Sequence, residues 1–455
     1  MKMEKRKYFG TDGIRGKANQ YPMVPELILQ LGKALGYVIR NKTKNNNNSN
    51  KIKLKIIIGK DTRTSGYMFE AALQAGIVSS GVDVLLVGPL PTPAIAHLTK
   101  SMNADAGIMI SASHNPANDN GIKIFDSEGF KLPDKMEYEI EKIMDNLKYN
   151  SKYIGKAKRI DEAMGRYIEF AKASINSNSL RGMKIVIDCA NGAAYHVAPK
   201  IFEELGAEII TINNKPEGYN INLNCGAQFP KNLSKTVKKE KAHLGIALDG
   251  DADRIILIDE KGNILSGDHI LALLSLQFKK ENKLKNNKIA ITVMSNYGLK
   301  KYLEKHKIDY IETKVGDKYV IEEIKRNKLN LGGEQSGHII MSDYTTTGDG
   351  IICGLHIANI LKNTKIKLSE LSKIIKLYPQ ILINIKVKNK PDINSLNSYK
   401  IIKKYEQEIN GKGRILVRYS GTENLCRVMV EHINIKKTKE IAQKISNEIK
   451  KEIGI

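Results

Sequence analysis

The 455-residue chain has no tryptophan, only four cysteines and no long apolar run. Cys189, Cys225, Cys353 and Cys426 lie far apart without a C-x-x-C pair, which excludes a disulfide framework and a thiolate zinc cluster. The apolar runs span only a few residues, whereas a membrane-spanning helix needs about 18. The basic N-terminus lacks the apolar segment of a secretory signal. We therefore expect a cytoplasmic protein with reduced thiols and no membrane association.

The chain is strongly basic, because it has 73 Lys and Arg residues but only 49 Asp and Glu, which gives a net charge of +24. Nucleic-acid binding is one interpretation of such a basic chain. However, the lysines are scattered among Ile and Asn along the whole sequence, and aromatic residues make up only 6%. No basic stretch is interleaved with aromatic residues that would stack on bases. The composition favours a soluble protein that binds no nucleic acid.

Strand, turn and helix patterns alternate along most of the chain, which predicts three similar α/β domains with mixed sheets. The C-terminal stretch differs, because a strand at 381–388 and a helix near 395–408 are followed by two consecutive strands at 413–420 and 426–432 and a final helix at 436–451. That order predicts a smaller α+β domain with an antiparallel sheet. The expected domains are 1–155, 156–258, 259–370 and 371–455.

The segment DGDADR at 249–254 lies between two apolar strand patterns. Three carboxylates at every second position can project to one side and share one hard divalent cation. The spacing also fits the start of an EF-hand, with Glu260 at the twelfth position. That interpretation fails because Arg254 replaces the required glycine and strands flank the loop instead of helices. The segment predicts a metal site at Asp249, Asp251 and Asp253, and a charged surface turn is the weaker interpretation.

The segment ISASHNP at 110–116 directly follows the apolar strand pattern AGIMI. Ligands gather at strand ends in α/β sheets, so Ser113 is a candidate nucleophile or carrier of a chemical group. The segment is not G-x-S-x-G, which disfavours a serine hydrolase. Taken alone, an Asn-Pro turn with serine as a local cap explains it about equally well.

Three further loops combine glycine with polar side chains. FGTDGIRG at 9–16 lets the backbone approach a ligand, offers Arg15 to a phosphate, and matches neither nucleotide-binding glycine motif. GEQSGH at 333–338 offers a carboxylate, an amide, a hydroxyl and an imidazole, a set suited to sugar hydroxyls and, through His338, to proton transfer. RYSGTE at 418–423 can form an anion nest at a strand end. Each loop alone is also explained by an ordinary turn or a structural histidine.

Together, the five loops from Phe9 to Glu423 resemble those of the α-D-phosphohexomutase superfamily over essentially the whole chain. The four-domain architecture of that superfamily agrees with the domains expected above. FGTDGIRG, ISASHNP, DNGIK, VGDKYV at 315–320, GEQSGH and SGTE are similar to the motifs of its bacterial phosphoglucosamine mutase family. The alternative is the phosphomannomutase/phosphoglucomutase group, which typically carries Met at the position of Gln335.

The resemblance implies an isomerase that interconverts glucosamine 6-phosphate and glucosamine 1-phosphate through a 1,6-bisphosphate intermediate. Such an enzyme feeds UDP-N-acetylglucosamine and cell-wall synthesis. Ser113 would be phosphorylated by a kinase or a sugar bisphosphate and would carry the phosphoryl group. Mg²⁺ would be held by Asp249, Asp251, Asp253 and one phosphoserine oxygen, and would offset the charge of the moving phosphoryl group. The protein is expected to be a monomer or a homodimer.

The resemblance also implies roles for the surrounding side chains. Lys123 is the expected general base and His338 an assisting acid/base. Arg15, His114 and Arg254 would line the phosphoserine. Further substrate-binding residues are expected to be Lys314, Asp317, Glu334, Ser336, Arg418, Ser420, Gly421, Thr422 and Arg427.

Two positions depart from the family pattern. Asn424 replaces the usual proline after SGTE, which is expected to loosen that turn. Lys318 stands where arginine is usual, so a bidentate contact there would become a point charge. Because four-domain clefts commonly close on substrate, hinge motion is predicted near 365–380.

Overall fold

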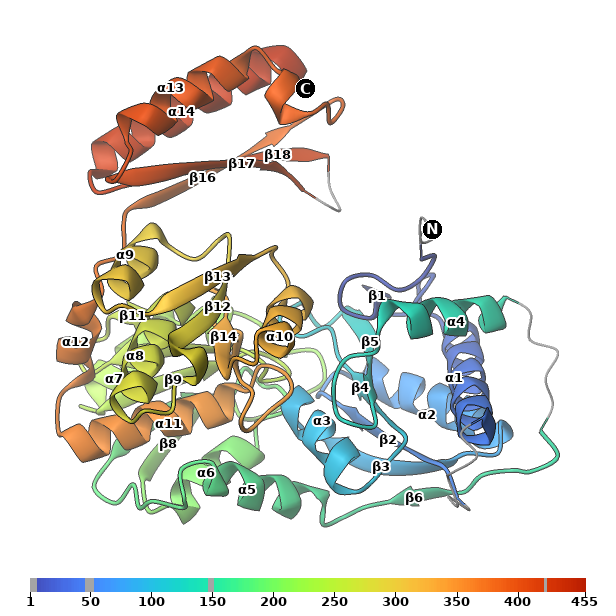
Figure 1. Cartoon of the computed structure of the whole chain (residues 1–455). Coiled ribbons are helices and arrows are strands. Elements are labelled where there is room, and N and C mark those ends of the chain that lie inside the picture. Colours follow the sequence, from blue (N-terminus) through green and yellow to red (C-terminus); the bar gives the residue numbers. More distant parts are fainter. Residues whose placement is uncertain (1–5, 46–52, 146–150, 421–423) are drawn as a thin grey trace. The chain divides into compact units, whose positions relative to one another are not determined.

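The structure is a computed structural model in which the chain forms two compact units (Figure 1). It describes residues 6–45, 53–145, 151–420 and 424–455. Unit 1 comprises Met1–Val293 and Tyr310–Ser372, and unit 2 comprises Met294–Asp309 and Lys373–Ile455. The last passage of the chain from one unit to the other, after Ser372, falls inside the region where a hinge is predicted.

The first sheet of unit 1 is mixed and six-stranded. Its order is β1 (Ile14–Lys17), β5 (Asp119–Asp126), β4 (Ala106–Ile110), β2 (Lys55–Lys60), β3 (Asp83–Pro89) and β6 (Ala157–Arg159). Strands β2, β3, β4 and β6 are parallel, whereas β5 is antiparallel to β4. Every residue of β4 is buried, as expected for a parallel strand covered on both faces. The helices beside this sheet are α1 (Pro25–Asn45), α2 (Ser65–Ser79), α3 (Thr92–Ser101) and α4 (Asp134–Met144).

The second sheet of unit 1 has five strands. Its order is β11 (Ile264–Leu265), β10 (Ile255–Asp259), β9 (Leu244–Leu248), β7 (Lys184–Asp188) and β8 (Glu208–Ile212). Strands β7, β8 and β9 are parallel and β10 returns antiparallel to β9. Both β9 and β10 are completely buried, so the loop that joins them is anchored in the core at both ends. The helices are α5 (Ala163–Ala173), α6 (Val197–Glu204) and α7 (Lys231–Lys239).

The third sheet has four strands in the order β13 (Asp309–Thr313), β12 (Lys288–Thr292), β14 (Leu331–Gly333) and β15 (Ile339–Met341). Strands β12 and β14 are parallel, and β15 is antiparallel to β14. The associated helices are α8 (Gly267–Lys280), α10 (Asp317–Arg326), α11 (Gly350–Thr364) and α12 (Leu368–Leu371).

Unit 2 is built on an antiparallel sheet of β16 (Gln380–Lys386), β18 (Leu425–His432) and β17 (Gly413–Tyr419). Helices α13 (Ser398–Glu408) and α14 (Ile435–Ile453) cover one face of the sheet (Figure 1). Helix α9 (Tyr297–Lys305) also belongs to this unit, although it precedes β13 in the chain. The buried Glu431 carboxylate explains this placement, because it accepts from Asn296 Nδ2 at 3.1 Å and from the Tyr297 backbone at 3.0 Å.

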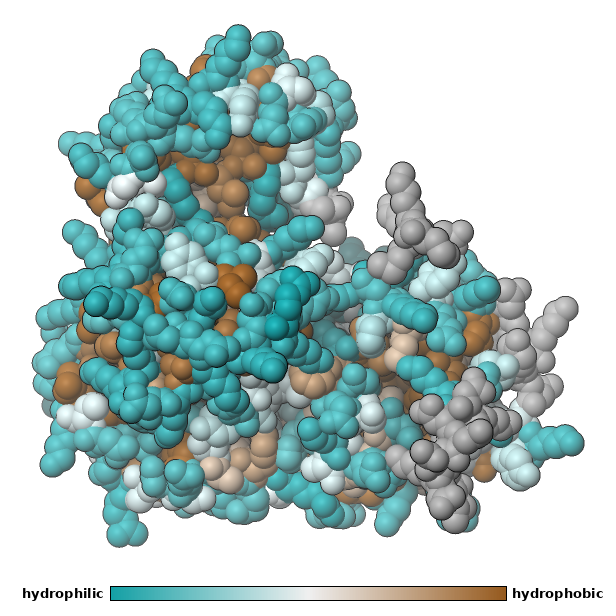
Figure 2. Space-filling model, in the orientation of Figure 1, coloured by the Kyte–Doolittle hydropathy of each residue, from teal (hydrophilic) through white to brown (hydrophobic). Residues whose placement is uncertain are grey.

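The fold prediction is confirmed, since three mixed sheets with helices are followed by a smaller antiparallel α+β unit. Strand β6 pairs with β3, so the first sheet continues just past residue 155. The domain boundaries themselves stay a prediction. Hydrophilic residues cover most of the visible surface of unit 1 (Figure 2). Within the described residues, no helix combines the length and apolar character that crossing a bilayer demands.

Candidate active site

Polar residues follow three parallel strands of the first sheet at the same edge. Asp61 and Arg63 follow β2, Thr92 follows β3, and Ser113 follows β4. The carboxyl ends of parallel strands face one side of the sheet, where ligand sites of α/β proteins form. Polar side chains from distant parts of the first domain are therefore gathered in one place.

Ser113 is buried at this edge and its hydroxyl faces the second domain. Its Oγ donates to Asp249 Oδ2 at 2.7 Å, and it lies 3.5 Å from Nδ1 of His114. The backbone N–H of Ser113 donates to the Ser111 hydroxyl at 2.8 Å. The predicted carrier residue and the predicted metal loop are thus in direct contact.

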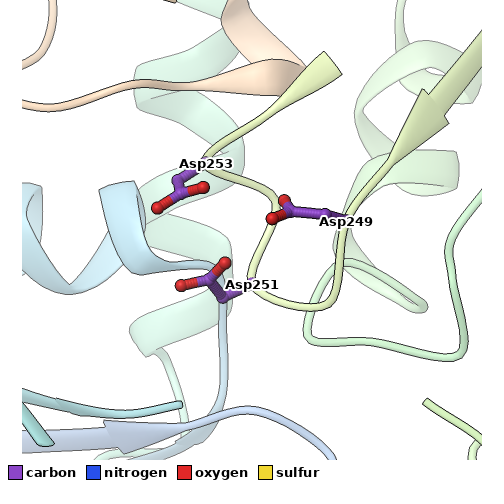
Figure 3. A group of neighbouring side chains, drawn as sticks. All are labelled: Asp249, Asp251 and Asp253. Carbon is purple, nitrogen blue, oxygen red and sulfur yellow. The ribbon is translucent and has the colours of Figure 1, made fainter. Parts of the chain in front are cut away.

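The loop between β9 and β10 brings three buried carboxylates together (Figure 3). Asp249, Asp251 and Asp253 each offer an oxygen within 4.8 Å of the others. Burial, together with repulsion from Asp253 and Asp251, raises the pKa of Asp249 to about 7. Oδ1 of Asp251 and Oδ1 of Asp253 are buried and accept no hydrogen bond from any described residue. The site therefore has carboxylate oxygens available as ligands, which suit a hard divalent cation such as Mg²⁺.

Lys123 on β5 supplies positive charge to this cluster. Its Nζ lies 2.7 Å from Asp251 Oδ2, 3.1 Å from Asp253 Oδ2 and 3.5 Å from Asp12 Oδ2. Burial alone would lower the pKa of Lys123, but these carboxylates outweigh it and hold the pKa well above its usual value. Lys123 is thus a cation as long as the aspartates are free.

Two arginines and His114 lie around Ser113. Arg15 pairs with Asp12 and donates to the Ala112 carbonyl at 3.4 Å. Arg254 contacts Nδ1 of His114. Burial, and then repulsion by Arg254 and Arg15, lowers the pKa of His114 to about 4, so this imidazole is neutral at physiological pH.

The GEQSGH segment forms the turn between β14 and β15. Glu334 Oε1 accepts from the Gly316 backbone at 2.9 Å, and the Ser336 hydroxyl lies 3.4 Å from Glu334 Oε2. Gly337 has a φ of +91°, and a Cβ there would come within 2.0 Å of the Ile255 carbonyl oxygen. Only glycine permits this close approach of the turn to β10.

His338 connects this turn to the metal loop. Its Nδ1 lies 3.6 Å from Asp253 Oδ1, and its Nε2 lies 3.6 Å from Asp317 Oδ2. The Gly348 N–H donates to Nε2 at 3.1 Å, which places the proton of the neutral ring on Nδ1, facing Asp253. Burial would lower the pKa of His338, but Asp253 and Asp317 raise it overall.

Several contacting residues were not predicted from the sequence. Lys131 pairs with both Asp12 and Asp317 and so joins the first and third domains. Thr92 Oγ1 donates to Asp251 Oδ2 at 2.6 Å. Asp12 lies inside the FGTDGIRG motif, and Thr92 is the first residue of α3 in the turn that follows β3, so these positions were the available sequence signal.

Two lysines near α10 take other partners. Lys318, which stands where arginine is usual, pairs with Asp134 at the start of α4. Lys314 has its Nζ 5.9 Å from the ring centre of Tyr319. The described contacts of both lysines are therefore with protein groups of unit 1.

The predicted phosphate loop belongs to unit 2. Arg418 on β17 is directly opposite Arg427 on β18, and burial together with the Arg427 charge lowers the pKa of Arg418. The Ser420 N–H donates to the Leu425 carbonyl at 2.9 Å, and Lys390 Nζ donates to the Ser420 carbonyl at 2.9 Å. Gly421 and Thr422 lie outside the described residues.

Comparison with known proteins matches the whole chain to one family. The phosphoglucomutase/phosphomannomutase models for the alpha/beta/alpha domains I, II and III and for the C-terminal domain match residues 6–151, 165–262, 266–378 and 382–448. A phosphoglucosamine mutase from Syntrophotalea carbinolica is 50% identical over 458 residues, covering 99% of each chain.

Solved structures share the fold at lower identity. A phosphoglucomutase/phosphomannomutase family protein from Burkholderia thailandensis superposes with a TM-score of 0.80 at 22% identity, covering 98% of this chain and 99% of its own. An Aspergillus fumigatus N-acetylphosphoglucosamine mutase, in complex with GlcNAc-6P and magnesium, gives a TM-score of 0.65 at 18% identity, covering 99% and 97%.

Proposed function

This chain belongs to the phosphoglucomutase/phosphomannomutase family, and from that membership we propose that it interconverts glucosamine 6-phosphate and glucosamine 1-phosphate. The resemblance seen in its five loops is thereby confirmed. Several curated phosphoglucosamine mutases are about half identical to it over nearly their full length, which identifies it as an isomerase of this kind.

One observation carries the chemistry: the buried Ser113 hydroxyl lies 2.7 Å from one of three clustered carboxylates. A serine beside a hard-cation site is suited to accept and return a phosphoryl group, since neutralising charge is the main demand of phosphoryl transfer. In the proposed reaction, O1 of glucosamine 6-phosphate attacks the phosphorus of phosphorylated Ser113 and Ser113 Oγ departs. The 1,6-bisphosphate turns over, and its 6-phosphoryl group returns to Ser113.

Mg²⁺ fits the donor set better than a softer metal, because all three ligands are carboxylate oxygens. Asp249, Asp251 and Asp253 would hold it, with one phosphoserine oxygen as a further ligand. When bound, the ion would supply charge neutralisation for the transferring phosphoryl group.

The cationic surroundings support roles for the other predicted residues. Arg15 and Arg254 would stabilise the phosphoserine, and neutral His114 would bond to it. Lys123 is a cation while it pairs with the aspartates, so it would have to release its own proton before it could act as general base toward the sugar hydroxyl. A divalent cation bound by the same aspartates would favour that release. His338, held between Asp253 and Asp317, would assist as acid/base.

Sugar and distal phosphate would be bound by different loops. Glu334 and Ser336 lie close together in the GEQSGH turn and would hydrogen-bond sugar hydroxyls in either orientation. Lys314 and Asp317 would add substrate contacts from the segment around Gly316, whose backbone N–H donates to Glu334. The opposed Arg418 and Arg427 would grip the phosphate that is not being transferred. Ser420, Gly421 and Thr422 would add hydroxyl and backbone donors to the same anion.

The test is a Mg²⁺-dependent coupled mutase assay primed with a trace of sugar 1,6-bisphosphate. It compares glucosamine 6-phosphate, mannose 6-phosphate and glucose 1-phosphate, with Ser113→Ala alongside. Rapid turnover of the amino sugar, lost in Ser113→Ala, is expected. A preference for mannose or glucose phosphate would move the protein to the phosphomannomutase/phosphoglucomutase alternative.

The product would enter UDP-N-acetylglucosamine and cell-wall synthesis. All four cysteines are buried free thiols, which supports a reducing, cytoplasmic location. Ser113 would first be phosphorylated by a kinase or a sugar bisphosphate. Intact mass and sedimentation measurements on the purified protein would give its phosphorylation level and distinguish monomer from homodimer.

A further inference from the structure

Ser113 adopts a backbone conformation that serine seldom takes. Its φ is +52°, in the left-handed region that side chains with a Cβ disfavour. Such a conformation persists only when surrounding contacts impose it. The contacts that impose it on Ser113 are therefore relevant to where its hydroxyl points.

Two donors from different domains bind the backbone carbonyls of this serine and of Asn115. Arg63 Nη2 donates to the Ser113 carbonyl at 3.3 Å and to the Asn115 carbonyl at 2.5 Å. Asn222 Nδ2 donates to the same two carbonyls, at 2.9 and 3.1 Å. Both carbonyl groups are thus held twice, once from the first domain and once from the second.

Both donors are themselves fixed. Arg63 is fully buried and paired with Asp61, whose backbone N–H donates to the Ile110 carbonyl at the end of β4 at 3.0 Å. The Asn222 backbone N–H donates to the Ala190 carbonyl at 2.9 Å. The Arg63 side chain is thus held by Asp61 as well as by the serine loop, and the backbone of Asn222 is fixed beside that loop.

The metal loop leaves room for this arrangement at Gly250. A Cβ at Gly250 would lie 2.6 Å from the Ser113 carbonyl oxygen and 2.8 Å from Asn222 Nδ2. The glycine between two of the metal-site aspartates therefore allows the serine loop, Asn222 and the metal loop to pack against one another.

We propose that Arg63 and Asn222 are positioning residues for phosphoryl transfer, which hold the 113–115 backbone so that Ser113 Oγ faces Asp249. This inference rests on the proposed function, because it assigns the geometry of the same serine. We call the hydrogen bonds from Arg63 and Asn222 to the Ser113 and Asn115 carbonyls the clamp. The clamp forms only when the loops of the first and second domains are packed together. Packing of the two domains therefore determines whether the Ser113 hydroxyl is oriented toward Asp249.

The variants Asn222→Ala, Asn222→Asp and Arg63→Lys test the clamp. Asn222→Ala removes one donor, and Asn222→Asp places acceptors against two carbonyl oxygens. Arg63→Lys keeps the charge beside Asp61 but shortens the reach toward the loop. Asn220→Ala is the matched control, because Asn220 lies in the same segment and bonds to Lys215 and Glu217 instead of the serine loop.

Three quantities are measured for each protein: kcat and KM for glucosamine 6-phosphate, the rate of Ser113 phosphorylation by glucose 1,6-bisphosphate followed by intact mass, and the unfolding midpoint. For Asn222→Ala we expect kcat and the phosphorylation rate to fall about 10- to 100-fold, with KM little changed. Both rates should be lower still in Asn222→Asp. In Arg63→Lys they should lie between those of Asn222→Ala and wild type, and in Asn220→Ala they should match wild type.

The outcomes separate this inference from the proposed function. A wild-type protein that neither turns over the sugar nor takes up phosphate would overturn the proposed function. A fully active wild type with an Asn222→Ala variant that equals it in kcat and in phosphorylation rate would overturn the positioning role alone. A loss confined to the unfolding midpoint would likewise assign Asn222 to stability and not to positioning.

Discussion

The ammonium group of Lys123 lies 2.7 Å from a carboxylate oxygen of Asp251. Lys123 is on β5 of the first domain, whereas Asp251 is on the β9–β10 loop of the second, so this pair joins the two domains at the aspartate cluster. The same oxygen of Asp251 also accepts from Thr92. Charge balance in the cluster and the docking of two domains therefore depend on the same contacts.

Mg²⁺ should stabilise the wild-type protein by filling the aspartate cluster. Binding to the folded state alone raises stability with ligand concentration, by about 3 kcal/mol at a hundredfold excess over Kd. Thermal unfolding with and without millimolar Mg²⁺ measures this. Asp251→Asn should lose most of the increase in unfolding temperature caused by Mg²⁺, whereas the surface variant Asp145→Asn should keep it. An equal shift in the Asp251 variant would place the bound ion elsewhere.

Replacing Lys123 by Met should destabilise the metal-free protein. The change leaves buried carboxylates without their cation, and breaking a buried ion pair from one side typically costs about 3–5 kcal/mol. Because Mg²⁺ supplies the missing charge, the loss should be smaller in its presence. Chemical denaturation in EDTA and in Mg²⁺ compares the two conditions. A loss of the same size in both would show that Lys123 does not balance the metal-site charge.

Much of the fold and of the site could be predicted from local patterns. Apolar β-branched runs predicted the strands, and the motif that follows β4 predicted Ser113 at a strand end. The carboxylates of the β9–β10 loop are close in sequence, so their clustering could also be predicted. In these cases the sequence pattern and the structure that it predicts involve residues close together in the chain.

Other contacts depend on how separate domains dock, which local patterns do not report. Arg63 and Asn222 lie in ordinary polar turns far apart in the sequence. They come close to each other only because both donate to the Asn115 carbonyl of the serine loop. Lys131 looks like a surface residue in the turn after β5, yet it bridges Asp12 and Asp317. Helix α9 joins unit 2 because Glu431, far along the chain, binds its first turn.

Stability should depend on pH through Asp349, the N-cap of α11. Its side chain accepts from the Ile351 and Ile352 backbone and from the Tyr167 hydroxyl at 2.8 Å. Burial raises the pKa of Asp349 from 3.8 to about 6. A raised pKa means that the folded state holds the proton more tightly, so this contribution is full below about pH 4 and is lost as pH rises through 6.

Asp349→Asn should remove that dependence while keeping the cap. A pKa shift of about two units corresponds to roughly 3 kcal/mol. The free energy of unfolding of the variant, measured relative to wild type, should therefore increase by about that much between pH 4 and pH 7. Urea unfolding across this range measures the difference, with Asp161→Asn as an exposed control. A constant difference between variant and wild type would mean that Asp349 has an ordinary pKa.

Arg418→Ala should weaken substrate binding without destabilising unit 2. Arg418 and Arg427 are directly opposite on neighbouring antiparallel strands, where like charges repel, and the lowered pKa of Arg418 reflects burial and that repulsion. Removing one guanidinium therefore relieves repulsion in the free protein, and it would take a charge-assisted bond from the phosphate that we propose Arg418 binds. We expect KM for glucosamine 6-phosphate to rise about 10- to 100-fold, since bonds to charged groups contribute about 1.5–3 kcal/mol. The unfolding midpoint should stay level or increase, and Arg414→Ala, which removes an ion-pair partner of the buried Glu431, should instead lower it. A fall in the Arg418→Ala midpoint with an unchanged KM would give Arg418 a structural role in the sheet and leave phosphate binding to other residues.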